Sequence, residues 1–199
     1  MSLIKICGLK SEADVDAVNL YLPDFAGFIV NYEKSRRNIS PEKLADLKKR
    51  LDSRIKAVAV TVDEPLESVR KIIKSGSADI AQLHGNENDD YIMSLKADGI
   101  EVWKAYVIKT AEDVKRALNS PADMVLLDAG RGNGTAFNWS LINNFGRNYI
   151  LAGGLDAGNL EIAYKMLSPC VFDVSSGAET DGVKDPFKIK KLVELAHSF

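Results

Sequence analysis

Short β-rich runs alternate with charged, helical segments along the whole chain, and this alternation limits the possible folds more than any other feature. Eight runs have the character of strands: residues 3–7, 25–30, 55–61, 79–83, 101–107, 123–128, 149–152 and 171–174. Several are almost continuously apolar, as in Ala57-Val58-Ala59-Val60, which is typical of strands covered on both faces. The pattern therefore favours a sheet with helices packed against it.

Segments with helical periodicity lie between these runs. The helix candidates are residues 11–20, 41–51, 65–75, 88–97, 111–118, 160–167 and 186–196. Three of them have a proline in the expected first turn, namely Pro41, Pro65 and Pro186, where its missing N–H costs nothing. Strands that alternate with helices predict a parallel sheet with right-handed crossovers.

The number of strands selects one architecture among the parallel folds. Eight is the closure number of the (β/α)8 TIM barrel, and 199 residues lies at the short end for that fold. No linker or composition shift marks a second domain, so we predict a single α/β barrel domain over residues 1–199. The competing open, doubly wound sheet would need fewer strands or an unclosed edge.

Bulk properties argue against several classes of partner. A net charge of −2 and a pI near 5.8 give no electrostatic case for nucleic acid. No segment approaches the roughly 18 uninterrupted apolar residues of a membrane span, and residues 1–7 lack the apolar run of a signal peptide. We expect a soluble, cytoplasmic protein that binds neither nucleic acid nor membrane.

A barrel of this kind carries its functional residues in the loops after the strands. Cys7 ends the first run, and Asp128 ends the apolar run at residues 124–127. A thiol and a carboxylic acid at the tips of two strands can form the acid/base pair that proton transfer at a sugar carbon requires. Lys5, two residues earlier on the same strand face, could favour the Cys7 thiolate. The alternatives are a small packing residue for Cys7 and a turn residue for Asp128.

The loops after the last two runs have the composition of a phosphate cradle. Gly153-Gly154 follows the seventh run, and Ser175-Ser176-Gly177 follows the eighth. Glycine lets backbone N–H groups approach an anion, and barrels often bind phosphate in these two loops. Ordinary tight turns are the alternative. The glycines at 130, 132 and 134 have GxGxG spacing rather than GxGxxG, so we interpret them as a mobile loop rather than a dinucleotide site.

Two further sets of polar residues follow strands. Lys34-Ser35-Arg36-Arg37 is a short basic loop, in which a guanidinium could hold a planar carboxylate through two hydrogen bonds. A solvated surface cluster is the alternative. His84 could line the mouth of the barrel, although a lone histidine is more often structural. No His, Cys or Asp cluster has metal-ligand spacing.

The motifs in these loops resemble those of the phosphoribosylanthranilate isomerase family, in the same order and over essentially the whole chain. The matching segments are residues 5–9, 27–30, 35–37, 82–85, 126–128, 134–139, 152–155 and 173–179. The resemblance implies a ribulose-phosphate-binding type of barrel that performs an Amadori rearrangement in tryptophan biosynthesis. It implies a small-molecule substrate, no metal or organic cofactor, and a monomer or homodimer.

The resemblance also implies roles for individual residues. Cys7 would be the general base, Asp128 the general acid, and Arg37, rather than Arg36, the ligand of the anthranilate carboxylate. The phosphate site would comprise Gly153, Gly154, Ser176 and Gly177. Gln82, His84 and Asp173 are additional substrate-binding candidates.

The chain departs from the family pattern after the sixth strand. It reads Arg131-Gly132-Asn133-Gly134, and Thr135-Ala136 stand where the family has a lysine. Two other functions are compatible with the motifs. One is another sugar-phosphate isomerase, and the other is a non-catalytic phosphate-binding barrel.

Overall fold

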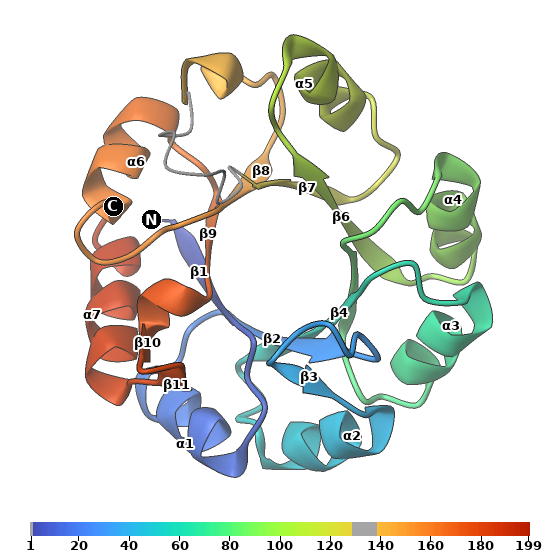
Figure 1. Ribbon diagram of the computed structural model, residues 1–199, viewed down its shortest axis with the longest axis vertical. Coiled ribbons are helices and arrows are strands. Elements are labelled where there is room, and N and C mark those ends of the chain that lie inside the picture. Colours follow the sequence, from blue (N-terminus) through green and yellow to red (C-terminus); the bar gives the residue numbers. More distant parts are fainter. Residues whose placement is uncertain (1, 129–138) are drawn as a thin grey trace.

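The computed structural model describes residues 2–128 and 139–199, and eight parallel strands in it close into a ring (Figure 1). The strands of the ring are β1 (Leu3–Cys7), β2 (Phe25–Val30), β4 (Lys56–Thr61), β5 (Ile80–Leu83), β6 (Glu101–Val107), β7 (Met124–Asp128), β8 (Tyr149–Ala152) and β9 (Val171–Val174). Closure occurs at β1, where Lys5 lies opposite Phe25 of β2 and Asp173 of β9. The predicted TIM barrel is confirmed.

Five of the eight strands have the bounds expected from the sequence, and three begin one residue later than predicted. Ile55 instead closes a turn with Asp52. Asp79 and Asp123 use their side chains to bond neighbouring strands. Three strands of two residues each were not predicted, namely β3 (Asn38–Ile39), β10 (Glu179–Thr180) and β11 (Val183–Lys184). Segments this short have no periodicity to detect.

Seven α-helices among the described residues surround the ring (Figure 1). They are α1 (Glu12–Tyr21), α2 (Pro41–Arg50), α3 (Leu66–Lys74), α4 (Asp89–Ala97), α5 (Ala111–Leu118), α6 (Leu160–Leu167) and α7 (Pro186–His197). Polar N-caps fix the start of most of them, as where Ser11 and Asp14 form a reciprocal capping box in α1. Pro65 is the N-cap of α3 rather than its first residue. Two 3-10 turns follow β7 and β9, at Trp139–Ile142 and Ser176–Ala178.

Among the described residues, apolar side chains fill the half of the ring nearer the N-terminal ends of the strands, and buried polar side chains lie nearer the carboxyl ends. Trp103 is almost fully buried in a cluster with Val58, Ile80, Leu126 and Ile150. Burial of side chains this large stabilises the fold by about 1.5–3 kcal/mol each. Above this layer lie the buried polar residues Lys5, Gln82 and Asp173. We call the two ends of the ring the bottom (N-terminal ends of the strands) and the mouth (C-terminal ends).

Three aspartates repeat one arrangement at the bottom. Asp24, Asp79 and Asp123 each directly precede a strand, and each accepts a hydrogen bond from the second residue of the neighbouring strand at 2.7–2.8 Å. Each also contacts a basic side chain of a nearby helix, namely His197 of α7, Lys48 of α2 and Lys96 of α4. We call them the bottom aspartates. They join each strand pair to a helix that packs beside it.

Cys170 occupies the corresponding position before β9. Its thiol donates to the carbonyl of Tyr149 at 2.9 Å. No helix among the described residues is long and apolar enough to cross a membrane.

Candidate active site

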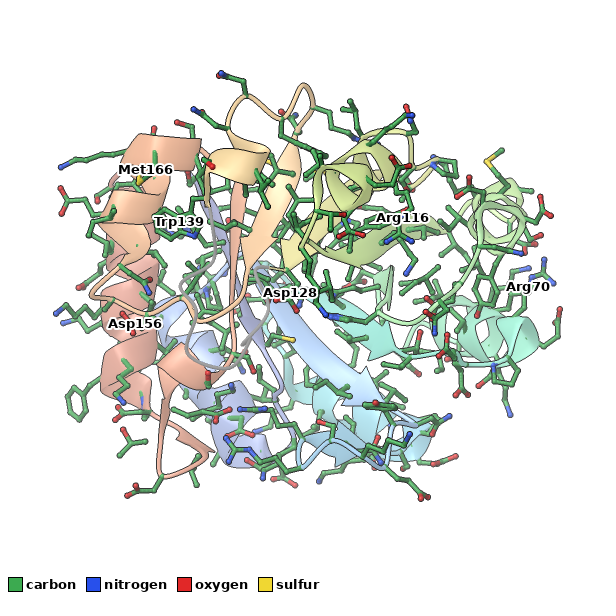
Figure 2. The ribbon with its side chains drawn as sticks, turned by 45° about the horizontal axis from the view of Figure 1, so that its top comes forward. Arg70, Arg116, Asp128, Trp139, Asp156 and Met166 are labelled. Carbon is green, nitrogen blue, oxygen red and sulfur yellow. The ribbon has the colours of Figure 1, made fainter. Side chains whose placement is uncertain are left out.

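The mouth of the ring surrounds a cavity of about 250 Å³. Its wall is formed by Cys7, Ile29, Val60, Gln82, His84, Asp128, Ala152, Gly153, Gly154, Leu155, Asp173, Ser175 and Ser176. Eight of the ten predicted site residues are therefore brought together in one wall. Gly177 lines an adjoining hollow, and Arg37 lies beside Gly8, next to Cys7. Figure 2 shows Asp128 near the centre of the molecule, with Arg70 and Arg116 toward the periphery.

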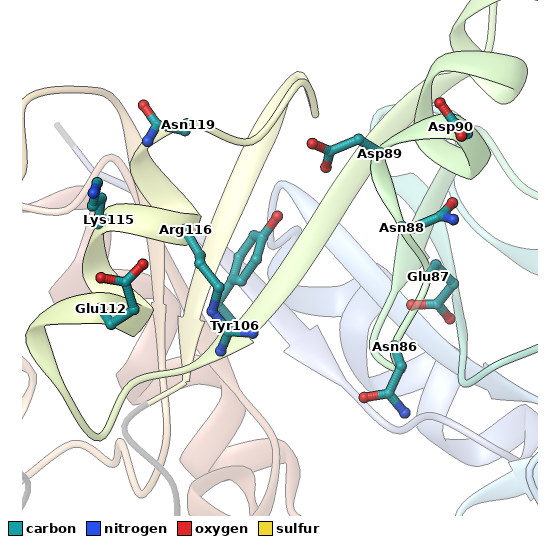
Figure 3. A pocket seen from close by; sticks show the side chains of 10 residues that line it. All are labelled: Asn86, Glu87, Asn88, Asp89, Asp90, Tyr106, Glu112, Lys115, Arg116 and Asn119. Carbon is teal, nitrogen blue, oxygen red and sulfur yellow. The ribbon is translucent and has the colours of Figure 1, made fainter.

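A larger hollow of about 580 Å³ lies outside the ring, between α4 and α5 (Figure 3). Asp89 and Asp90 line one side, and Lys115 and Arg116 line the other, with Tyr106 between them. It is an open surface groove that contains none of the predicted site residues. We therefore place the candidate active site in the smaller cavity, where the reactive groups meet.

Cys7 lies against a buried ion pair. Lys5 is fully buried, and its Nζ donates to Asp173 Oδ1 at 3.0 Å. Gly27 of β2 makes this proximity possible: a Cβ there would be 2.8 Å from Lys5 Cε and 2.9 Å from Cys7 Sγ. The sequence predicted that Lys5 would share a face with Cys7, but it did not indicate that Asp173 would hold Lys5 or that Gly27 would make room.

The charges around Cys7 act in opposite directions. Burial raises the pKa of the Cys7 thiol above its usual value of 9.0, and Lys5 offsets part of that increase. Burial also works against the charged form of Lys5, but Asp173 and Cys7 outweigh it, so the pKa of the Lys5 ammonium is raised. Lys5 therefore carries a fixed positive charge beside a sulfur that is neutral at rest.

Asp128 faces the imidazole of His84 across the cavity mouth. His84 Nε2 lies 3.5 Å from Asp128 Oδ2, and both side chains are about a quarter exposed (30% and 23%). On its other side, His84 Nδ1 lies 3.3 Å from Nε2 of the buried Gln82. A carboxyl group, an imidazole and an amide thus form a continuous polar series from the mouth into the ring.

The loops after β8 and β9 have the backbone geometry that an anion cradle needs. Gly153 and Gly154 have φ values of +97° and +66°, a region that residues with a Cβ rarely adopt. Gly177 packs so closely on the backbone of Leu155 that a Cβ would clash with its carbonyl oxygen. The two loops can therefore pack this closely because Gly177 has no side chain.

Positive charge lies next to this pair of loops. Gly154, Ser176 and Gly177 also line an adjoining hollow of about 410 Å³, together with Lys188 and Lys191 of α7. Lys188 Nζ donates to the backbone carbonyl of Glu179 at 2.6 Å, which fixes its position. Neither lysine was predicted as a site residue, because α7 follows the motif that drew attention to the loop.

Arg37 is bound by a carboxylate of the protein itself. Its Nε and Nη2 donate to the two oxygens of Glu179 at 2.6 and 2.7 Å. Arg36 and the buried Lys184 donate to the same carboxylate. Burial works against ionisation of Glu179, but the hydrogen bonds from Arg37 and Lys184 outweigh it and lower the pKa of the carboxyl to about 2.

Sequence reasoning missed Glu179 and Lys184 as functional residues. Glu179 is the last residue of the segment 173–179 that matched the family motif, but the match alone did not indicate what this residue does. The loop at residues 129–134, predicted to be mobile beside Asp128, lies outside the described residues. Within residues 2–128 and 139–199, no group of three His, Cys, Asp or Glu side chains is placed to hold a metal ion.

Sequence comparison finds relatives across the full length. Residues 4–195 match a family model described as N-(5'-phosphoribosyl)anthranilate (PRA) isomerase. A protein of that name from Clostridium acetobutylicum is 39% identical and is covered completely, as is this chain. Its counterpart from Thermoanaerobacter sp. is also 39% identical, over 98% of this chain and 97% of its own length.

Comparison of structures agrees. Phosphoribosyl anthranilate isomerase from Thermotoga maritima superposes with a TM-score of 0.88 at 33% identity, with both chains fully covered. A structure of a phosphoribosyl anthranilate isomerase in complex with reduced 1-(o-carboxyphenylamino)-1-deoxyribulose 5-phosphate also has a TM-score of 0.88 at 33% identity, with both chains fully covered. A 3-hexulose-6-phosphate synthase at 15% identity, with a TM-score of 0.71, shares the fold.

Proposed function

The chain belongs to the N-(5'-phosphoribosyl)anthranilate isomerase family, and from this premise we propose that Cys7 is the general base and Asp128 the general acid of its reaction. The protein is an isomerase of tryptophan biosynthesis. It converts N-(5'-phosphoribosyl)anthranilate into 1-(2-carboxyphenylamino)-1-deoxyribulose 5-phosphate. The observation that best supports the two roles is their position in one cavity wall, with a buried cation behind the thiol.

The first step is opening of the ribose ring. Asp128 gives its proton to the ring oxygen, the bond between that oxygen and C1' breaks, and the anthranilate nitrogen becomes the nitrogen of an iminium ion. A general acid contributes about 10²–10⁴-fold to such a step. Asp128 is suited to it because it projects from the end of β7 into a partly enclosed cavity.

The second step is proton removal from C2'. The Cys7 thiolate takes this proton, the electron pair neutralises the iminium, and an enolamine forms. The enolamine then gains a proton at C1' and loses the hydroxyl proton at C2', which yields the ketone. Burial disfavours the thiolate, but Lys5 and the positive iminium both favour it, so the base is strengthened when the substrate needs it.

The remaining site residues bind the two ends of the substrate. Gly153, Gly154, Ser176 and Gly177 hold the phosphate, close to the charges of Lys188 and Lys191. Arg37 holds the anthranilate carboxylate. Glu179 occupies Nε and Nη2 of its guanidinium, which orients Nη1 for a second carboxylate. Binding both ends places the reacting carbons between Cys7 and Asp128.

We further propose that residues 1–199 act as one domain, in the cytoplasm, as a monomer or a homodimer. Cys7, Asp128 and the residues assigned to the phosphate line two adjoining hollows of one chain. This arrangement suits a phosphorylated small-molecule substrate rather than nucleic acid or membrane.

Turnover of phosphoribosylanthranilate generated in situ, followed by its fluorescence loss, tests the proposal. We expect Cys7→Ala to lower kcat by at least about 10²-fold with an unchanged melting temperature. Cys170→Ala is the matched control, since Cys170 lies at the bottom of the ring, and it should keep the wild-type kcat. Equal losses of kcat in the two variants, or melting losses that account for them, would remove Cys7 from its role.

A further inference from the structure

Gln82 and His84 lie on the same face of the β5 segment and form a series that ends at the general acid. Gln82 is fully buried, and its Nε2 lies 3.3 Å from His84 Nδ1. His84 Nε2 lies 3.5 Å from Asp128 Oδ2. Among the described residues, Gln82 Oε1 has no hydrogen-bond partner. The contact with His84 is therefore the interaction that orients this amide.

Which atom donates and which accepts at each contact follows from the chemistry of the three groups. An amide nitrogen can only donate, so Nδ1 of the imidazole accepts and Nε2 carries the hydrogen. That hydrogen faces Oδ2 of Asp128. With the amide turned over, Nδ1 would carry the hydrogen, and Nε2 would present a lone pair able to take the proton of Asp128 away from the substrate. The orientation with the amide nitrogen toward His84 is therefore the productive one.

The backbone around His84 is fixed by an independent network. His84 N donates to Thr61 O at 2.8 Å. Gly85 donates to Glu87 at 3.0 Å, and its carbonyl accepts from Lys104 at 2.7 Å. Lys104 and Glu87 are themselves a buried ion pair at 3.1 Å. Because the backbone is held on both sides of His84, its ring position relative to Asp128 depends on the side-chain contacts alone.

We propose that Gln82 and His84 are positioning residues of the isomerase: Gln82 holds His84 in the tautomer with hydrogen on Nε2, and His84 orients the carboxyl of Asp128. His84 Nε2 lies 3.5 Å from Oδ2, and a hydrogen bond formed there during the reaction would leave the transferable proton on Oδ1 and stabilise the carboxylate after the proton has left. The proposal rests on the general-acid role of Asp128. It replaces direct substrate binding, the role expected for both residues from the sequence.

The role of His84 can be tested by replacing it with Ala and then asking whether Gln or Asn at the same position restores turnover. We expect His84→Ala to lower kcat by about 10²-fold with KM within about threefold, because the group acts through Asp128. His84→Gln should recover at least about tenfold, because its amide nitrogen reaches the position of Nε2. His84→Asn reaches only the position of Nδ1 and should not recover. A rise in KM at constant kcat would assign His84 to substrate binding, and equal kcat in the Gln and Asn variants would also overturn the proposal.

A double-mutant cycle with Asp128→Ala tests whether His84 acts through the acid. Once Asp128 is absent, removing His84 should lower kcat little further. Additive losses of kcat would contradict the proposal. Gln82→Met, which keeps the volume but removes the donor, should lower kcat about tenfold in the wild type and leave His84→Ala unchanged. If Asp128→Ala itself keeps wild-type turnover, the proposed function fails. If only Asp128→Ala is impaired and His84→Ala is not, this inference alone fails.

Discussion

The bottom and the mouth of the barrel use the same chemical groups in opposite ways. At the bottom, Asp24, Asp79 and Asp123 each accept from the backbone of a neighbouring strand and contact a His or Lys side chain of a nearby helix. At the mouth, Asp128 and Asp173 face a cavity wall that also holds a thiol and an imidazole. The bottom carboxylates accept from the backbone and stabilise the fold, whereas at the mouth Asp173 holds the buried Lys5 beside the thiol and Asp128 is the proposed proton donor.

Glu179 is a second ion-paired carboxylate at the mouth. Its carboxylate accepts from Arg37, Arg36 and Lys184. It therefore orients a binding residue instead of moving a proton. Asp173 and Glu179 therefore share one role at the mouth, which is to hold a cationic side chain of the site in place.

The largest difference in kcat between the two ends is expected when one aspartate at each end is replaced by asparagine. We expect Asp128→Asn to lower kcat by about 10²–10⁴-fold with little change in stability. Asp123→Asn should leave kcat of the folded protein unchanged and lower the free energy of unfolding by about 1–3 kcal/mol, because the N–H of Val102 loses a charged acceptor. Turnover and urea denaturation of both variants measure this, and equal effects of the two on kcat would break the comparison.

The buried pair at Cys7 predicts an unusual pH dependence. Cys7 acts as the thiolate and its pKa is raised above 9.0, whereas Asp128 acts in its protonated form, so the small thiolate fraction limits kcat/KM at neutral pH, and kcat/KM should fall with pH only above the pKa of Cys7. Lys5→Met removes the opposing charge, so turnover at neutral pH should fall and the descending limb of the profile should move to higher pH. It also leaves Asp173 buried without its partner, at a cost of about 3–5 kcal/mol in stability.

Removal of the second charge supplies the control for this prediction. In the Lys5→Met/Asp173→Asn double variant, the negative charge that raises the pKa of Cys7 is gone as well. Its pH profile should lie between those of wild type and Lys5→Met. Identical profiles for all three proteins would show that the pair has no electrostatic effect on the thiol.

Arg37 tests substrate binding at the mouth. Arg37→Ala removes the guanidinium proposed to hold the anthranilate carboxylate, and a hydrogen bond to a charged group is worth about 1.5–3 kcal/mol. We expect KM to rise by about 10–10²-fold and kcat to change less. Arg36→Ala is the matched control, because Arg36 donates to the same Glu179 but is largely exposed. Similar KM values for the two variants would contradict the assignment.

The smallest effect is expected at the bottom, where only the cation is removed. Lys48 pairs with Asp79, and both side chains are partly exposed. Exposed ion pairs contribute about 0–1 kcal/mol to stability. Lys48→Met should therefore destabilise far less than Asp79→Ala, which also deprives the N–H of Ala57 of its acceptor. Thermal unfolding of the two variants distinguishes the contribution of the backbone hydrogen bond from that of the ion pair.

The features that could be predicted from the sequence are those determined by residues close together in the chain. Strand bounds such as Leu3–Cys7 follow from local periodicity, and Lys5 could be placed beside Cys7 because alternate residues of a strand share a face. Gly27, Glu179 and Lys184 could not be assigned roles, because each acts through residues distant in the chain. Asp79 and Asp123 were misplaced inside strands, since their bonding to a neighbouring strand leaves no trace in the periodicity.

The bottom aspartates have a consequence for the order in which the molecule assembles. Their bonds to the neighbouring strands join residues only 20–22 positions apart, so they can form within a short stretch of chain before the ring exists. The Lys5–Asp173 and Arg37–Glu179 contacts span 168 and 142 positions, and the first of them needs β9 to have joined β1. During refolding, helix and strand signals should therefore return before turnover does, because the thiol acquires its charged neighbours only when the last strand completes the circle.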